Sequence, residues 1–93
     1  MDSVFQNEKV CYECGTTLDI HEHHIFSGYA NRKKSEKYGL KVYLCAKHHN
    51  MSDDSVHFNP KMNKYFKTLG QMYFEEHYGS RQDFIREFGK SWL

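Results

Sequence analysis

Two short stretches rich in histidine decide how this chain can fold: residues 20–25 read IHEHHI, and residues 44–50 read LCAKHHN. A third stretch, CYEC at residues 11–14, lies just upstream of the first. Thiolates and imidazoles are the side chains that bind zinc and other transition metals. The three stretches supply more of these ligands than one ion needs. The sequence therefore predicts a metal-stabilised domain, with ligands for more than one metal ion and a histidine left over for acid–base chemistry.

Three cysteines and one histidine have the spacing of a closed zinc site. Cys11 and Cys14 form a C-x-x-C pair, and Cys45 and His48 form a C-x-x-H pair. Each pair can bring two side chains to one point, and a structural zinc ion takes four such ligands in tetrahedral array. The alternative is three buried free thiols beside a surface histidine, but the paired spacing favours a structural Zn²⁺.

The length of the chain limits its organisation. With 93 residues it is expected to form one domain over residues 1–93. We expect a metal-bound unit at residues 11–57 and a helical extension at residues 58–93. Three cysteines cannot all pair as disulfides, the first residues do not resemble a signal peptide, and no segment has the length of a membrane span. These features predict a cytoplasmic protein, where spaced thiols more often hold metal.

The charges are unevenly distributed along the chain, although the net charge is only +1. Residues 1–27 hold five acidic side chains against one lysine, whereas residues 28–50 hold six basic side chains against one glutamate. Such a basic segment is typical of phosphate binding, or else of a solvated lysine-rich loop. Its position between metal-ligand motifs favours DNA contacts by Arg32, Lys33, Lys34 and Lys37.

Hydrophobic patterning predicts two strands in the N-terminal half. The first should run from Leu18 to His24 or Ile25, and the second should cover residues 41–45. A short helix over residues 46–51 should follow and carry His48 and His49. Residues 26–40 are expected to form a long connection with a helical turn near residues 32–38. Residues 1–9 are expected to be a loose arm, and residues 52–55 a loop.

The C-terminal third predicts two helices. Pro60 suits the first turn of a helix capped by Asn59, apolar residues recur at helical spacing from Met62 to Tyr73, and the helix should end near Tyr78 and Gly79. Ser80 should begin the second helix, with Asp83 completing a capping box, and Gly89 should end it. We interpret both helices as packing elements, because stripes of aromatic residues at this spacing usually belong to a core.

The pattern at residues 11–57 resembles the HNH endonuclease family. The resemblance rests on Cys11-x-x-Cys14, His23-His24-Ile25 and Cys45-x-x-His48-His49. It implies an α+β fold with a small zinc-bound ββα-metal core, in which two strands and a helix surround one catalytic cation, followed here by the two packing helices. The segment at residues 35–40 and the phenylalanine-rich C-terminal helices also look like those of small phage-encoded proteins with this domain.

The resemblance implies a role for each remaining histidine. His24 would be the general base, and His23 and His49 would bind the catalytic cation, which would be Mg²⁺ or a transition metal such as Mn²⁺, Ni²⁺ or Zn²⁺. His57 is the preferred third ligand, with Asp53 as the alternative. The implied activity is hydrolysis of DNA phosphodiester bonds by nicking or weakly specific cleavage, in the host cytoplasm if the chain is phage-encoded.

One departure from the family pattern keeps a second function open. The family has an asparagine before the second strand that orients the base, and residues 38–41 contain none. Either the Tyr38 hydroxyl or a backbone carbonyl orients His24, or the chain is a weak or inactive HNH-like module. Such a module would bind another protein as an inhibitor or adaptor. The histidines would then be surface residues or additional zinc ligands. The sequence does not decide the oligomeric state.

Overall fold

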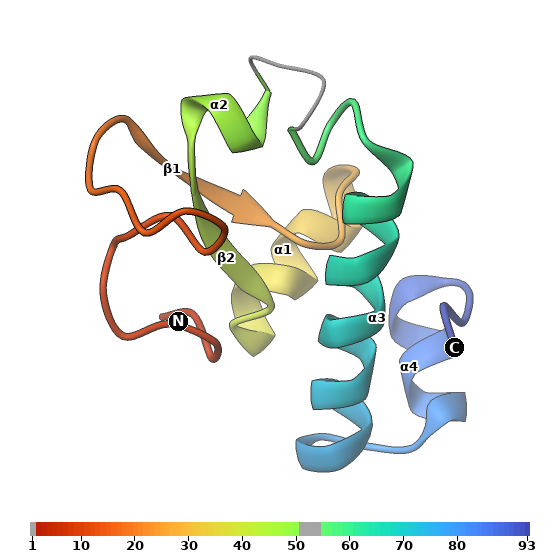
Figure 1. Cartoon of the computed structure of the whole chain (residues 1–93). Helices are drawn as coiled ribbons and strands as arrows, with labels where there is room; N and C mark the ends of the chain where they lie inside the picture. The colour runs from red at the N-terminus through yellow and green to blue at the C-terminus, as the bar shows by residue number, and fades with distance from the viewer. Residues whose placement is uncertain (1, 51–54) are drawn as a thin grey trace.

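The two strands of the chain lie side by side, and the first of them carries the pair His23 and His24. In the computed structural model, which describes residues 2–50 and 55–93, strand β1 covers Ile20–His24 and strand β2 covers Lys41–Cys45. They pair in antiparallel register, with Ile20 opposite Cys45 and His24 opposite Lys41. Both predicted strands are confirmed. Every residue of β2 is buried, so this strand lies in the interior of the fold, next to β1 (Figure 1).

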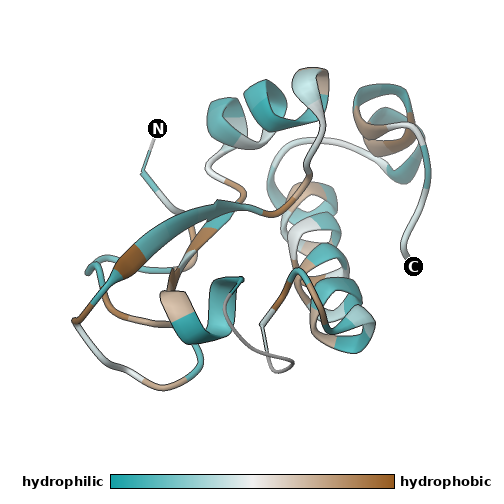
Figure 2. Cartoon of the chain, turned by 90° about the horizontal axis from the view of Figure 1, so that it is seen from above, coloured by the Kyte–Doolittle hydropathy of each residue, from teal (hydrophilic) through white to brown (hydrophobic). Residues whose placement is uncertain are grey.

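Helix α1 covers Tyr29–Tyr38 and links the strands. The sequence interpretation of residues 26–40 as a long connection with one helical turn was wrong in extent, because ten residues are helical. The helix was hard to recognise because its residues are almost all hydrophilic (Figure 2) and only Ser35 is buried. It ends at Gly39, whose φ of 71° lies in the left-handed region that glycine adopts readily.

Helix α2 covers Ala46–His49 and follows β2 without a connecting loop. The backbone N–H of Val56 donates to the carbonyl of His48, and the N–H of His57 donates to the carbonyl of His49. These two bonds bring the segment after α2 back against it. The predicted loop at residues 52–55 falls largely on residues 51–54, which lie outside the described residues.

Helices α3 (Pro60–His77) and α4 (Arg81–Phe88) agree with the predicted C-terminal pair. The Asn59 side chain accepts hydrogen bonds from the N–H groups of Lys61 and Met62, and Ser80 and Asp83 form the predicted capping box. Both helices lie to one side of the strands, with α1 behind the strands and α2 above them (Figure 1). None of the helices in the described part of the chain is sufficiently long and apolar to cross a membrane.

One hydrophobic cluster joins the strands to the C-terminal helices. The described residues thus form an α+β fold with a two-stranded sheet and four helices. The cluster combines residues next to the predicted metal ligands with phenylalanines from α3 and α4; its buried members are Cys11, Ile25, Phe26, Leu40, Val42, Leu44, Cys45, Val56, Phe66, Phe74, Phe84 and Phe88. Burial of these side chains provides the apolar part of the stability of the fold.

The N-terminal segment is held against β2, so the expectation of a loose arm at residues 1–9 was wrong. The hydroxyl of Ser3 donates to the carbonyl of Lys41 at 2.5 Å, and the N–H of Val4 donates to the carbonyl of Gly39 at 3.0 Å. The side-chain oxygen of Gln6 accepts from the N–H of Tyr43 at 2.7 Å. These contacts span more than 30 residues of sequence, which is why local patterning could not reveal them.

Ser35 fixes the loop that follows β1, and replacing it by alanine is expected to destabilise the protein. Its hydroxyl accepts from the N–H of Phe26 and donates to the carbonyl of Phe26, both at 3.0 Å. Ser35→Ala would leave both buried backbone groups without a partner, at about 1–3 kcal/mol each. We expect the free energy of unfolding in urea to fall by at least about 2 kcal/mol. Thr17→Ala, at an exposed position, should change it little; equal effects would contradict this role of Ser35.

Candidate functional site

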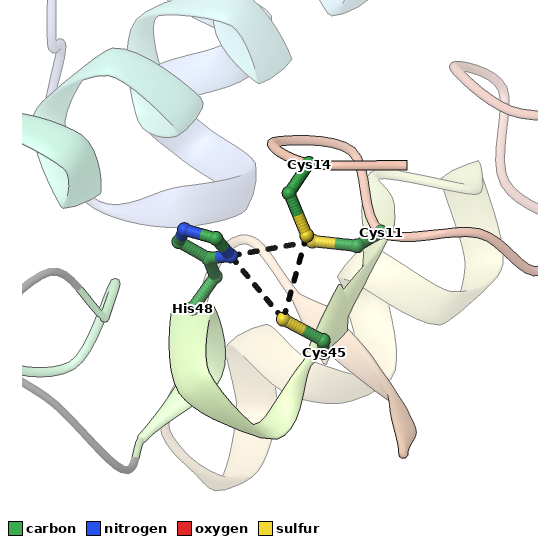
Figure 3. Close-up of side chains that lie close together, drawn as sticks. All are labelled: Cys11, Cys14, Cys45 and His48. Carbon is green, nitrogen blue, oxygen red and sulfur yellow. Dashed lines mark hydrogen bonds between the residues drawn. The ribbon is translucent and has the colours of Figure 1, made fainter. Parts of the chain in front are cut away.

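Four side chains from two distant segments meet beside the start of α2. Cys11 and Cys14 come from the N-terminal segment, Cys45 ends β2, and His48 lies on α2 (Figure 3). The ring nitrogen Nδ1 of His48 lies 3.2 Å from the sulfur of Cys45 and 3.6 Å from that of Cys11. The sulfurs of Cys14 and Cys45 are 3.8 Å apart. The four predicted structural ligands are therefore brought together.

Two of these three distances match the edges of a zinc tetrahedron, and the third, 3.2 Å between His48 and Cys45, is somewhat shorter. With Zn–S bonds of about 2.3 Å and Zn–N bonds of about 2.0–2.1 Å, tetrahedral angles place two sulfurs about 3.8 Å apart, and a sulfur and a nitrogen about 3.6 Å apart. The four ligand atoms all lie within 4.8 Å of one another. Three thiols and one imidazole are also a common donor set of structural zinc. The residues therefore fit a zinc ion, which this site could hold.

The cysteine pair is shaped by its own backbone. The N–H of Gly15 donates to the carbonyl of Cys11, and the N–H of Cys11 donates to the carbonyl of Thr16, both at 2.8 Å. Gly15 has a φ of 76°, which residues with a side chain rarely adopt. The N–H of Tyr12 also donates to the carbonyl of Tyr43 on β2. This tight turn aims both thiols at the end of the strand.

The thiols have perturbed acidities. Burial raises the pKa of Cys11, but backbone hydrogen bonds from Cys45, Cys14 and Glu13 outweigh it and bring this pKa down to about 6. For Cys14, which is exposed, a backbone hydrogen bond from Thr16 lowers the pKa, yet partial desolvation and the neighbouring thiols of Cys11 and Cys45 outweigh that bond and raise it. Crowding of several sulfurs therefore opposes their joint ionisation. A bound cation relieves such repulsion.

A second group consists of three histidines. Alternation along β1 places His21 and His23 on the face of the sheet that α2 covers, where His49 lies. The Nε2 atoms of His49 and His57 are 3.0 Å apart. One ring nitrogen from each of His23, His49 and His57 lies within 4.8 Å of the others. The structure thus brings together the three predicted cation ligands; the alternative ligand, Asp53, lies outside the described residues.

The buried member of this group has an unpaired nitrogen. His23 is only 5% exposed, and its Nε2 has no hydrogen-bond partner among the described residues. Burial lowers the pKa of His23 to about 3, and burial together with His57 and His21 lowers that of His49 to about 4. A buried polar atom without a partner costs free energy. An ion held by the three imidazoles would satisfy this nitrogen.

His24 lies on the opposite face of β1, between two carboxylates. Its Nε2 is 3.5 Å from an oxygen of Glu22 and 3.9 Å from an oxygen of Glu36. Burial lowers the pKa of His24, and the two carboxylates oppose this shift in part. The Tyr38 ring instead packs against Phe74. Neither carboxylate was predicted to lie beside His24, although the alternation of β1 places Glu22 on the same face as His24.

Lys41 forms ion pairs with both of these carboxylates. Its ammonium group lies 2.5 Å from an oxygen of Glu36 and 3.1 Å from an oxygen of Glu22, and the residue is only 4% exposed. Burial lowers the pKa of Lys41, but the hydrogen bonds to Glu36 and Glu22 outweigh it and raise this pKa. The hydrogen bond from Lys41 lowers the pKa of Glu36. The lysine therefore neutralises part of the negative charge of the two carboxylates beside His24.

The lowered pKa of Glu36 predicts a pH-dependent contribution to stability. A carboxylate with a depressed folded-state pKa stabilises the fold above its unfolded pKa, about 4.3, and this stabilisation is lost as the pH falls through the folded value. Glu36→Gln should therefore lower the free energy of unfolding at pH 7, by at most about 1 kcal/mol because the side chain is 45% exposed.

The measurement is a series of urea denaturation curves from pH 7 to pH 3, recorded on the wild type and on Glu36→Gln after each has been loaded with zinc. The difference between wild type and Glu36→Gln should stay constant above about pH 6 and vanish in acid. Acid would also release zinc held by the four cysteine and histidine residues in either protein, so only the difference between the two proteins is informative. A difference that grows as the pH falls would contradict the assigned ion pair.

His24 and the group of three histidines border the same cavity. A hollow of about 240 Å³ is lined by His23 and His24 at the end of β1, together with Arg32 of α1, His49 of α2 and His57. A larger hollow of about 730 Å³ adjoins it and shares His24, Ser27 and Arg32. A ligand in this cavity could contact His24 and the three-histidine group at the same time.

The four basic residues singled out on α1 do not all face this cavity. Arg32 and Lys33 line the larger hollow. The ammonium group of Lys34 instead donates to the carbonyl of Glu87 in α4 at 2.5 Å. That of Lys37 lies 5.1 Å from the centre of the Tyr38 ring. Arg32 and Lys33 therefore line the hollow that His24 also borders, where the ammonium group of Lys33 donates to the Tyr29 hydroxyl at 3.0 Å, whereas Lys34 and Lys37 do not line it.

The geometry establishes a cluster of cysteine and histidine ligands that could hold a zinc ion, and a second group of three histidines beside a cavity. Among the residues described, Glu22, His24 and Glu36 form one more group close enough to share an ion, but the ammonium group of Lys41 lies between its carboxylates. No family model, curated protein or solved structure matches this chain.

Proposed function

We propose that this protein is a metal-dependent endonuclease of the HNH type, which hydrolyses phosphodiester bonds in DNA. In this proposal β1, β2 and α2 form a zinc-stapled ββα-metal core. The observation that carries it is the shared cavity, because His24 and the group of His23, His49 and His57 border the same hollow. A general base and a cation site on one cavity are the two parts that metal-assisted hydrolysis needs.

His24 acts as the general base in this proposal. Its Nε2 faces the carboxylates of Glu22 and Glu36, so the N–H of the neutral ring belongs on that side. The nitrogen Nδ1 is then free to accept a proton from a water molecule that attacks the phosphorus atom. The carboxylates stabilise the imidazolium that forms. They thereby take over the orienting role that the family pattern gives to the missing asparagine.

His23, His49 and His57 would hold the divalent cation. When bound, this ion stabilises the extra charge on the phosphate and the leaving oxygen. Three imidazoles favour Mn²⁺, Ni²⁺ or Zn²⁺, although phosphate hydrolysis often uses Mg²⁺. Arg32 and Lys33 would contact neighbouring phosphates, which provides affinity but little sequence preference.

A plasmid assay tests the proposal. Purified zinc-loaded protein is incubated with supercoiled plasmid in EDTA, Mg²⁺, Mn²⁺ or Ni²⁺, and the conversion to nicked and linear forms is followed on gels. We expect nicking that requires an added ion. No nicking with any of these ions would overturn the proposed activity.

The basic residues should differ in their contribution to DNA binding. Arg32→Ala and Lys33→Ala should each weaken binding to a short duplex and reduce the slope of log affinity against log salt by about 1, because each removes a phosphate contact. Lys34→Ala is the matched control, since its ammonium group contacts the Glu87 carbonyl. Fluorescence anisotropy at several salt concentrations measures the slope, and equal slopes for all three variants would contradict the assignment.

A second candidate function is an HNH-like module that binds a protein without cleaving DNA. The carboxylates of Glu22 and Glu36 favour it, because they lie where a phosphate would approach His24. Lys41 neutralises only part of this charge. One zinc per chain, no nicking and no binding to duplex DNA would together support this second function.

A further inference from the structure

His49 has a partner at each of its two ring nitrogens. Its Nδ1 lies 2.9 Å from Nδ1 of His21, and its Nε2 lies 3.0 Å from Nε2 of His57. The rings of His21 and His49 stand at 90° to each other, with centroids 5.0 Å apart. His21 has no counterpart among the motifs that carry the family resemblance, so its contact with His49 needs an explanation of its own.

The two sides of His49 are not equivalent. On the Nε2 side three imidazoles converge, since one nitrogen from each of His23, His49 and His57 lies within 4.8 Å of the others. His23 adds a buried Nε2 without a hydrogen-bond partner. Two adjacent ligands with bonds of about 2.1 Å at right angles around one ion lie about 3.0 Å apart, which matches the distance between Nε2 of His49 and Nε2 of His57. The cation side of His49 is therefore Nε2.

We infer that His21 is a positioning residue, which holds His49 in the tautomer that binds the cation. A neutral imidazole has one N–H. When this group sits on Nδ1 of His49 and donates to Nδ1 of His21, the lone pair of Nε2 points toward His23 and His57. Partners of this kind fix both the tautomer and the ring orientation of a metal ligand, and their loss costs about 10–100-fold in metal affinity.

Nickel affinity provides the first test of this inference, which rests on the cation site of the proposed function. Ni²⁺ is titrated into zinc-loaded protein in a calorimeter, with zinc content checked afterwards. His57→Ala should lose binding at this site, whereas His21→Ala should weaken it about 10–100-fold. His21→Gln, which keeps a hydrogen-bond acceptor, should recover part of the loss. His77→Ala, which removes a histidine stacked on Tyr73, should leave the affinity unchanged.

The tautomer of His49 provides a second test that needs no added nickel. Long-range ¹H–¹⁵N spectra of the zinc-loaded protein should show the N–H of His49 on Nδ1, and His21→Ala should shift it toward a mixture of tautomers. An N–H on Nε2 in the wild type would overturn the inference, and so would a nickel affinity of His21→Ala within twofold of the wild type. Loss as complete as in His57→Ala would make His21 a ligand instead. Absence of nickel binding by the wild type would overturn the proposed cation site, while the spectra would still decide whether His21 holds His49.

Discussion

Replacing Cys14 by serine is expected to unfold the protein or leave it aggregated at room temperature. The side chain is one of four that could hold a zinc ion, and it comes from a segment about 30 residues away from the other half of the site. Zinc binding to such sites is worth on the order of 10 kcal/mol at neutral pH. Domains are stable by only about 5–15 kcal/mol in total, so a zinc ion held by these four residues would supply most of the stability.

The choice of Cys14 separates metal binding from packing. Cys14 is exposed, whereas Cys11 and Cys45 are buried in the hydrophobic cluster. Cys14→Ser therefore removes a ligand without leaving a cavity in the core. Leu18→Ser is the matched control, because Leu18 lies four residues further along and is 72% exposed. Thermal melts and zinc content decide between them, and an unchanged melting temperature with one zinc per chain in Cys14→Ser would refute the assigned site.

Replacing His24 by alanine is expected to lower the rate of plasmid nicking by a factor of about 10²–10⁴, the usual contribution of a general base. The fold and the zinc content should be retained, because His24 faces the cavity and is not one of the four residues of the zinc group. Its loss removes the proposed proton acceptor and leaves Glu22 and Glu36 paired with Lys41.

Two further variants serve as a control and a comparison for the nicking rate of His24→Ala. His77→Ala removes a histidine at the end of α3, which stacks on Tyr73, and should nick plasmid at the rate of the wild type. Glu22→Gln should reduce the rate less than His24→Ala, because it removes only one of the two carboxylates that face the base. Full activity of His24→Ala would exclude this side chain as the base, even if nicking itself were observed.

The metal ligands could be predicted from sequence because each pair is set by local geometry. A C-x-x-C turn and a C-x-x-H step from strand to helix each bring two side chains to one point. The choice between His57 and Asp53 as third cation ligand depended on where the chain goes after α2, and spacing could not decide it. The backbone bond from His57 to His49 brings the His57 imidazole beside that of His49, while Asp53 lies outside the described residues.

Two parts of the fold could not be predicted from local patterns. Helix α1 has no apolar stripe, since its one buried residue is Ser35 and Tyr38 at its end packs against Phe74, so periodicity gave no signal for its full length. The carboxylate of Glu36, carried on that helix, consequently could not be placed beside His24. The N-terminal segment is held by hydrogen bonds of Ser3 and Gln6 to β2, and such distant polar contacts leave no periodic pattern in a sequence.

The attachment of the N-terminal segment to β2 also covers an open edge of the two-stranded sheet, which should limit aggregation. A strand edge with unpaired backbone groups is a template on which other molecules can add a strand and aggregate. On the edge of β2 that faces away from β1, the N–H of Tyr43 bonds to Gln6 and its carbonyl accepts from Tyr12, while the carbonyl of Lys41 accepts from Ser3. The polar residues ahead of Cys11 thus cover this strand edge. A chain shortened to begin at Cys11 would lose the bonds of Ser3 and Gln6 to β2 and should aggregate more readily.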